Sequence, residues 1–249
     1  MNTVSVVIPV YNEERRLPGC IPKLVDFLER RCEWAWEVVI ADNGSTDRTS
    51  SIAESMVREH RRVRVTRIPE KGRGGAVKTA WLASASDILS YMDVDLSTDL
   101  EAFPELIEAI ACGAYDLAIG SRLLDGSRTE RSWRREVISR AYVGLLRHLC
   151  RVEISDAQCG FKAISRPAAR ALLPLVQDSG WFFDTELLVL AMRRGYRVRE
   201  LPVHWTENRD SRVKLLRTAW EDLRGLWRLR QTVPTARCPA LPPEGGKPE

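Results

Sequence analysis

The N-terminal half of the chain alternates between short apolar runs and longer segments with apolar side chains at helical spacing. VSVVIPV (4–10) and EVVIADN (37–43) are nearly continuous β-branched runs, typical of strands buried on both faces of a parallel sheet. Between them, residues 14–31 predict an amphipathic helix. Its apolar positions lie three or four residues apart: Leu17, Ile21, Leu24, Val25 and Leu28.

The alternation continues to residue 121. Further helices are predicted over 47–59, 75–85 and 99–112, and further strands over 63–68, 87–93 and 116–121. Strands alternating with helices indicate an α/β fold with an open, doubly wound, mostly parallel sheet. In such sheets, ligands bind beyond the carboxyl ends of the strands. The polar clusters YNEE, DNGSTD and DVD each follow a predicted strand, so we expect them to meet at that edge.

The second half of the chain is less regular. Its predicted elements are helices over 133–151, 166–176 and 184–194, a polar loop over 155–162, a strand over 196–205 and an arginine-rich helix over 213–230. The tail, residues 232–249, contains five prolines and no apolar periodicity, so we expect it to be disordered.

Composition limits the classes of function. The 249 residues suit one large domain, or one domain with a tail. A net charge of +4 does not indicate a nucleic-acid partner, although arginines crowd residues 122–151 and 193–230. No stretch reaches the ~18–20 apolar residues of a membrane span. The N-terminus lacks the features of a signal peptide, and the six cysteines form no CxxC pair. These features predict a cytoplasmic protein.

Asp93 and Asp95 stand at the end of a predicted strand with one residue between them. Alternation along a strand places residues i and i+2 on one face, so we expect both carboxylates to point the same way. A solvated turn, an acid–base pair and the ligands of a hard divalent cation would each explain the pair. The sheet topology favours Mg²⁺ or Mn²⁺, which relieves the repulsion between the carboxylates and leaves positions for phosphate oxygens.

The glycine-rich stretch KGRGGAVKT matches neither of two phosphate-binding patterns. Val77 stands where a Walker loop and a dinucleotide-binding loop each need glycine. What remains is a flexible basic loop, with Lys71 and Arg73 near glycines that let backbone amides approach an anion. In DNGSTD, residues 45–47 predict a helix cap, whereas Asp42, last in its strand, is a candidate functional residue.

Five motifs follow one another along the chain: PVYNEE, ADNGSTD, KGRGGAV, DVDLST and DAQCGFK. In this order and at these distances, over about residues 4–215, they resemble the family 2 glycosyltransferases, in particular the polyprenyl-phosphate glycosyltransferases. DAQCGFK and WFFDTELL resemble the dolichyl-phosphate glucose synthases more than the mannose synthases. The resemblance implies a GT-A fold, a nucleotide-sugar donor, a polyprenyl phosphate acceptor and inversion at the anomeric carbon.

The resemblance also implies donor-binding roles by position. The base and ribose would be surrounded by Pro9, Tyr11 and Glu13. Asp42 would hold the base, and Lys71 and Asp93 would approach the rest of the nucleotide. The metal would be held by Asp93, Asp95 and Ser97. Asn43 departs from the family's usual aspartate, which removes one negative charge and leaves Asp42 intact.

Acceptor roles are implied in the second half of the chain. Arg122 resembles the family arginine that faces the acceptor phosphate. Further acceptor contacts are implied at Arg134, Arg135, Ser139 and Arg140. A loop that closes over the diphosphate would contain Arg209, Ser211 and Lys214. The guanidinium fork matches phosphate geometry, although a solvated charged face also explains any one of these residues.

The predicted reaction releases a diphosphate, whose developing charge a metal stabilises. A lipid phosphate is already an anion near neutral pH, so no strong general base is needed and Asp184 would organise the site. The expected catalytic residues are Asp93, Asp95, Arg122 and Asp184. UDP-glucose is the preferred donor and GDP-mannose its main competitor. Two alternatives remain: a transferase for a soluble or glycan acceptor with Asp184 as base, and a non-catalytic nucleotide-sugar-binding module.

Two basic amphipathic segments, 133–150 and 213–230, predict peripheral contact with the cytoplasmic face of a membrane. In the first, the apolar face comprises Trp133, Val137, Ala141, Leu145 and Leu149. In the second, it comprises Leu216, Trp220, Leu223 and Trp227. Packing against the core is the alternative for both. The predicted division is a nucleotide-sugar-binding half (1–122), an acceptor-binding half (123–231) and the tail (232–249).

Overall fold

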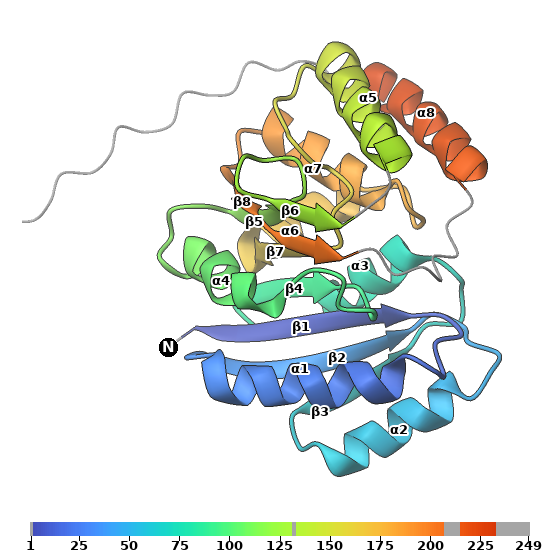
Figure 1. Ribbon diagram of the computed structural model, residues 1–249, viewed down its shortest axis with the longest axis vertical. Coiled ribbons are helices and arrows are strands. Elements are labelled where there is room, and N and C mark those ends of the chain that lie inside the picture. Colours follow the sequence, from blue (N-terminus) through green and yellow to red (C-terminus); the bar gives the residue numbers. More distant parts are fainter. Residues whose placement is uncertain (1, 131–132, 207–214, 233–249) are drawn as a thin grey trace, which may run out of the picture.

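The structure is a computed structural model that describes residues 2–130, 133–206 and 215–232. Its centre is a seven-stranded sheet in the order β3-β2-β1-β4-β7-β5-β8 (Figure 1). The strands are β1 (Thr3–Val10), β2 (Ala35–Asp42), β3 (Val63–Arg67), β4 (Ile88–Met92), β5 (Leu117–Ser121), β7 (Phe161–Ser165) and β8 (Val198–Pro202). Only β7 runs antiparallel to its neighbours in this sheet. The predicted open, mostly parallel sheet is confirmed.

Helices cover both faces of the sheet. One face packs against α1 (Leu17–Arg31), α2 (Thr49–Glu59) and α4 (Phe103–Ala111), which follows the short 3₁₀ helix η1 (Leu100–Ala102). The other face packs against α3 (Arg73–Ala83), α6 (Arg166–Leu172) with the 3₁₀ helix η2 (Leu173–Leu175), and α7 (Phe183–Arg193). Alternation along β1 explains the two layers, because Val6 and Ile8 belong to the first core and Val7 to the second.

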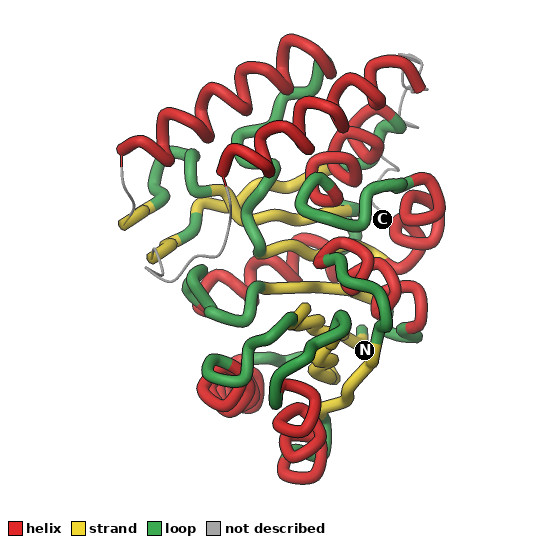
Figure 2. The backbone as a smooth tube through the Cα atoms, turned by 90° about the vertical axis from the view of Figure 1, so that its right-hand side faces the viewer, coloured by secondary structure: helices red, strands yellow, loops and turns green. Residues whose placement is uncertain are grey.

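Two long helices, α5 (Trp133–Cys150) and α8 (Leu215–Thr232), lie side by side beyond the α7 face (Figures 1 and 2). Leu146 of α5 and Leu226 of α8 are fully buried in the second core. Val137 and Trp227, from the predicted apolar faces, are 56% and 62% exposed. In the described part of the chain, no helix has the length and apolar character needed to cross a membrane.

The structure corrects three expectations. Residues 161 and 162, expected in a loop, begin β7, which the sequence did not indicate because the buried Lys162 interrupts a short apolar run. The strand expected over 87–93 ends at Met92, so Asp93 and Asp95 follow it in a turn and strand alternation does not apply to them. The strand expected over 196–205 is divided into β8 and β9 (His204–Thr206), and β9 pairs in parallel with the unexpected strand β6 (Arg128–Glu130).

The seven-stranded sheet contains strands from both sides of the predicted division at residue 122, since β5 pairs with both β7 and β8. The division into a donor half and an acceptor half therefore stays a prediction about roles. The predicted disordered tail lies outside the described residues, apart from Thr232 at the end of α8.

Candidate active site

The loops after β1 and β2 interlock at the carboxyl edge of the sheet. The Asn12 amide donates to the Ser45 hydroxyl at 3.0 Å, and the Thr46 amide donates to Asn12 Oδ1 at 2.7 Å. The Glu13 amide donates to Thr49 Oγ1 at 2.8 Å. Asn12 has φ 55°, in the left-handed region that asparagine tolerates better than most residues. The expected meeting of YNEE and DNGSTD is thus confirmed.

Asp42 is 3% exposed, and it organises its own loop. Its Oδ1 accepts from the Ser45 amide at 3.1 Å, and its Oδ2 accepts from the Ser50 hydroxyl. Both carboxylate oxygens therefore already have donors within the turn. This is the capping chemistry of a loop that leads into a helix, and the role of Asp42 in holding a base stays a prediction.

Asn43 links three segments through its side-chain amide. Its Nδ2 donates to the Val10 carbonyl at 2.8 Å, and its Oδ1 accepts from the Gly72 amide at 3.2 Å. An ionised aspartate accepts hydrogen bonds but donates none, so it could not make the first contact. The amide at this position thus ties the end of β1 to the glycine-rich loop.

The residues expected around the nucleotide are only partly brought together. Lys71 Nζ lies 3.9 Å above the centre of the Tyr11 ring, a cation–π contact between two of them. Pro9 is buried within β1, where it pairs with Ala41 of β2. The Glu13 carboxylate lies 3.6 Å from Arg16. Direct contact of these residues with a base or ribose stays a prediction.

Asp95 and Ser97 lie in the turn after β4. Asp95 Oδ1 accepts from the Ser97 amide at 3.1 Å. Leu96, between them, has φ 46°. A branched side chain in this left-handed region costs roughly 1 kcal/mol or more, and such strain concentrates at functional loops. The turn is therefore held in a conformation that its sequence does not favour by itself.

Asp93 packs directly against the backbone of Gly160, in the loop before β7. The Asp93 amide donates to the Gly160 carbonyl at 3.2 Å. A Cβ atom added to Gly160 would lie 1.8 Å from Asp93 Oδ2, which is far inside contact distance. The DAQCGFK motif therefore needs glycine at this position so that Asp93 can adopt its observed conformation.

Arg73 joins Asp93 to Asp184. Its Nε and Nη2 donate to Asp93 Oδ1 at 3.1 and 2.7 Å, and its Nη1 donates to Asp184 Oδ2 at 2.7 Å. The guanidinium also lies 4.9 Å from the Tyr91 ring centre and 5.0 Å from that of Trp181. The sequence placed Arg73 in a basic loop but gave no sign that it pairs with the carboxylate of Asp93.

Asp184 is 2% exposed and has partners on both oxygens. Its Oδ1 accepts from the Tyr91 hydroxyl and lies 3.3 Å from Lys162 Nζ, and its Oδ2 is held by Arg73. Burial acts to raise the pKa of Asp184, but Lys162 and Arg73 outweigh it, so the pKa is lowered. A carboxylate held in this way organises a site and is poorly suited to accept a proton.

Arg122 is oriented by a buried carboxylate in the DAQCGFK loop. Its Nε and Nη2 donate to the two oxygens of Asp156 at 2.6 and 2.9 Å, and its backbone amide donates to Asp156 Oδ2 at 3.1 Å. Asp156 is 3% exposed. This bidentate pair fixes the guanidinium at the carboxyl end of β5. The sequence indicated Arg122 but not Asp156.

Of the other acceptor residues predicted on α5, the structure describes the side chains of Ser139 and Arg140. Arg140 pairs with Glu136 one turn earlier on α5, at 2.9 Å, with its side chain 63% exposed. Ser139 is half-buried on the same helix. Arg134 and Arg135 belong to the first turn of α5, but their side chains lie outside the described residues, as do Arg209, Ser211 and Lys214 entirely.

The carboxylates of Asp93 and Asp95 suit a metal ion whose other ligands come from a substrate. Asp93 and Asp95 offer carboxylate oxygens, the ligands that Mg²⁺ and Mn²⁺ prefer. Within the described ranges, no three His, Cys, Asp or Glu side chains form a group that could hold a metal without help. Mg²⁺ usually binds through one or two carboxylates, water and substrate phosphates, and these residues fit that pattern.

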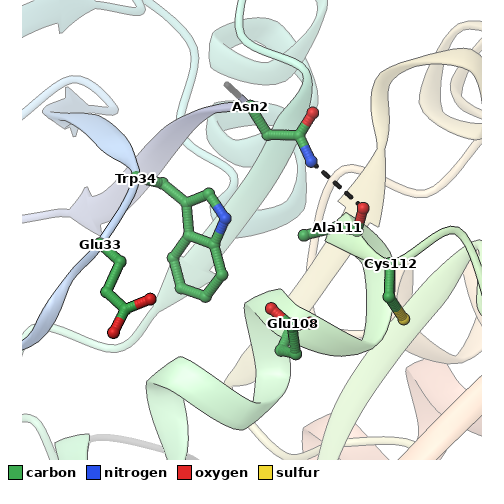
Figure 3. Close-up of a pocket in the computed structure, with 6 residues that line it drawn as sticks. All are labelled: Asn2, Glu33, Trp34, Glu108, Ala111 and Cys112. Carbon is green, nitrogen blue, oxygen red and sulfur yellow. Dashed lines mark hydrogen bonds between the residues drawn. The ribbon is translucent and has the colours of Figure 1, made fainter.

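A surface pocket lies at the opposite end of the sheet (Figure 3). It is lined by residues before β1, before β2 and at the end of α4: Asn2, Glu33, Trp34, Glu108, Ala111 and Cys112. The Asn2 side chain donates to the Ala111 carbonyl at 3.3 Å across it. No predicted site residue lines this pocket, so it is separate from the candidate active site.

Comparison with known proteins identifies a family that covers most of the sheet and the candidate active site. The model of the family "Glycosyl transferase family 2" matches residues 5–173. Glycosyltransferase AglD of Haloferax volcanii is 44% identical over 216 residues, which cover 86% of this chain but 35% of that protein. The dolichyl-phosphate beta-glucosyltransferase of Mus musculus is 33% identical over 260 residues, covering 92% of this chain and 78% of that protein. The chain thus spans about a third of AglD and most of the mouse enzyme.

A solved structure with the same fold is glucosyl-3-phosphoglycerate synthase from Mycobacterium tuberculosis. Its complex with Mn²⁺, UDP and glucosyl-3-phosphoglycerate has a TM-score of 0.68 at 20% identity, covering 94% of this chain and 81% of that one. Its complex with Mg²⁺ and UDP gives 0.69 at 19% identity. At this level of identity the likeness concerns the fold, and the expected GT-A fold is confirmed.

Proposed function

Because the chain belongs to glycosyl transferase family 2, we propose that it moves a hexose from a nucleotide sugar to a polyprenyl phosphate, with inversion and with the help of Mg²⁺ or Mn²⁺. UDP-glucose is the proposed donor. The names of the relatives support this choice, since several are dolichyl-phosphate beta-glucosyltransferases.

The state of Asp184 is the main argument for a phosphate acceptor. A transferase that deprotonates an acceptor hydroxyl needs a carboxylate with a free oxygen and a pKa that is not depressed. Asp184 has neither, because Tyr91, Lys162 and Arg73 engage its oxygens and its pKa is lowered. A phosphate oxygen is already nucleophilic near neutral pH and needs no such base.

In the proposed reaction, an acceptor phosphate oxygen attacks the anomeric carbon from the face opposite the leaving group. The bond from that carbon to the donor diphosphate breaks, and its electron pair leaves with the nucleoside diphosphate. Arg122, held by Asp156, orients the acceptor phosphate. Asp93 and Asp95 would hold the metal, which when bound stabilises the negative charge of the leaving diphosphate.

Peripheral membrane contact is part of the proposal, because the acceptor is a lipid. Leu223 and Trp227 of α8 lie at the surface, where they are 48% and 62% exposed. Val137 and Ile138 of the neighbouring α5 are 56% and 50% exposed. Exposed tryptophan and aliphatic side chains between arginines are typical of a helix that lies in a membrane interface.

A transfer assay tests the proposal. Purified protein, Mn²⁺ and a short polyprenyl phosphate are incubated with labelled UDP-glucose or GDP-mannose, and label in the organic phase is counted. Label from UDP-glucose alone supports transfer of glucose to the lipid phosphate, and label from GDP-mannose alone changes the sugar. Metal-dependent release of nucleotide without a lipid product contradicts the lipid acceptor and favours a soluble or glycan acceptor.

A further inference from the structure

Arg73 makes more hydrogen bonds to Asp93 and Asp184 than it would need to neutralise one of these carboxylates. One edge of the guanidinium donates twice to Asp93 Oδ1, and the other edge donates to Asp184. The Arg73 side chain is 11% exposed, and that of Asp184 is 2% exposed. Arginine has a rigid planar fork with five donors, so it can join two carboxylates in a fixed geometry, which the single ammonium group of lysine cannot do.

The backbone of Arg73 is held as firmly as its side chain. Arg73 is the first residue of α3, and the amides of the next two residues donate to the carbonyls of Gly180 and Ser179 at 3.2 and 2.9 Å. A Cβ atom on Gly74 would lie 2.2 Å from the Cβ of Phe183, so α3 and α7 touch at their first turns. The start of α3 therefore cannot shift without moving the segment that leads into Asp184.

The carboxylate of Asp93 is thus constrained from two sides. Arg73 holds its Oδ1, and its Oδ2 lies against the Gly160 backbone. We infer that Arg73 is a positioning residue, which fixes the carboxylate of Asp93 for the divalent cation while Asp184 anchors Arg73 from behind. This inference rests on the proposed function, since it assumes that Asp93 binds the metal of a transfer reaction.

Arg73 acts on the orientation of the Asp93 carboxylate and not on the affinity of the site for the metal. Arg73 is a cation and is not a metal ligand, so its removal leaves both Asp93 and Asp95 in place. Its positive charge also opposes a nearby divalent cation. Loss of Arg73 should therefore leave Mn²⁺ binding no weaker, while it relaxes the geometry. Residues that orient metal ligands typically contribute about 10- to 100-fold to metal affinity or activity, and here we expect that loss in kcat.

Arg73→Gln is the principal variant, because Asp184 keeps Lys162 and Tyr91 as partners and Asp93 is 41% exposed to water. Arg73→Lys keeps the charge without the fork and serves as a second variant in case the first does not fold. Arg67→Gln is the matched control, since Arg67 forms a surface pair with Glu54 and is 61% exposed.

Three measurements are made on each variant: transfer kinetics, the EPR spectrum of Mn²⁺ bound together with UDP, and the thermal midpoint of unfolding. We expect Arg73→Gln to fold and bind Mn²⁺ with UDP, to give an altered EPR spectrum, and to lose about 10- to 100-fold in kcat with a smaller change in KM for the donor. Arg73→Lys should not restore kcat. Arg67→Gln should match the wild type in every respect.

A wild-type EPR spectrum and kcat in Arg73→Gln, or in Arg73→Lys if only that variant folds, would overturn the inference. So would loss of Mn²⁺ binding by a folded variant, because Arg73 would then act on binding and not on orientation. Failure of the wild-type protein to bind Mn²⁺ with UDP would instead overturn the proposed function, together with this role. The anchor is tested by Arg73→Gln combined with Asp184→Asn, which should lose no more kcat than Arg73→Gln alone.

Discussion

The contact between Gly160 and Asp93 shows how closely a single residue sets the geometry of this site. A methyl group at residue 160 would lie 1.8 Å from Asp93 Oδ2, so the carboxylate or the loop must move. The loop also holds Asp156, which orients Arg122. One added carbon atom would therefore disturb both the proposed metal ligand and the proposed acceptor contact.

We predict that Gly160→Ala lowers transfer activity by about 100-fold, because misplacement of a reacting group by about 1 Å has an effect of that size. Activity measured at saturating donor and metal tests this. Gly144→Ala is the control: Gly144 lies within α5 with nothing inside 4 Å of the added atom, so this variant should keep full activity and gain about 0.5–1 kcal/mol in stability. Equal activity of the two variants would contradict the role given to Gly160.

At the scale of elements, α8 is attached to the DAQCGFK loop through an unusual carboxylate. Asp222 is 5% exposed, and its Oδ2 accepts from Gln158 Nε2 at 2.8 Å. Among the described residues, no donor satisfies its Oδ1. Burial raises the pKa of Asp222 to about 6, and Gln158 counteracts this only in part. The ionised form of this residue therefore opposes docking of the helix.

The stability contributed by Asp222 decreases as the pH rises. The folded pKa lies above the ordinary value of 3.8, so the folded state binds the proton more tightly than the unfolded state. The contribution of Asp222 to stability falls as the pH rises from about 4 to about 6 and stays low above that. We predict that Asp222→Asn stabilises the protein at pH 7.5 by about 1–3 kcal/mol, since each pKa unit corresponds to about 1.4 kcal/mol.

Urea unfolding of the wild type and of Asp222→Asn at pH 4.5 and pH 7.5 measures the predicted difference in stability. The advantage of Asp222→Asn should shrink at the lower pH, where the carboxyl group becomes protonated in the folded protein. A variant that is less stable than the wild type at pH 7.5 would show that Asp222 has a stabilising partner.

The exposed face of α8 gives a second prediction at this scale. Replacing Leu223 and Trp227 together by serine should reduce binding to vesicles that contain anionic lipid at least 10-fold, because the apolar contact area of the helix is lost. The thermal midpoint should change little, since both side chains are exposed. Vesicle co-sedimentation measures binding, and Leu82→Ser, at an exposed site on α3, is the control. Unchanged binding would mean that α8 is not the membrane contact.

For the whole molecule, the periodicity of apolar residues predicted the parallel part of the fold and the polar edge, because β1 to β4 are local runs that are each followed by a helix. It could not predict β7, whose place between β4 and β5 depends on pairing with strands far away in the chain. The site shows the same limit. The sequence indicated Asp93 and Arg122 as candidates because they follow strands, whereas the contacts of Arg73, Asp156 and Lys162 involve partners distant in sequence.

Ligand binding should also be visible in the stability of the whole molecule. The complex of UDP with Mn²⁺, at 100 times its dissociation constant, should stabilise the wild-type protein by about 2.7 kcal/mol, or roughly 5–10 °C. Asp95→Asn should fold with an unchanged midpoint in the absence of ligands, show little stabilisation by the pair and lose transfer activity. Differential scanning fluorimetry measures both midpoints. Full stabilisation of Asp95→Asn would remove Asp95 from the metal site.

The antiparallel strand β7 has a consequence for biosynthesis. Strands β1 to β4 are made first, but β4 lacks its second neighbour until residues 161–165 have been added. During that interval an apolar strand presents unpaired backbone groups, a surface to which other chains readily add. A fragment of residues 1–122, although it contains Asp42, Asp93 and Asp95, would keep that open edge permanently. We therefore expect such a fragment to aggregate during expression, and the donor-binding residues to become usable only after the second half has been synthesised.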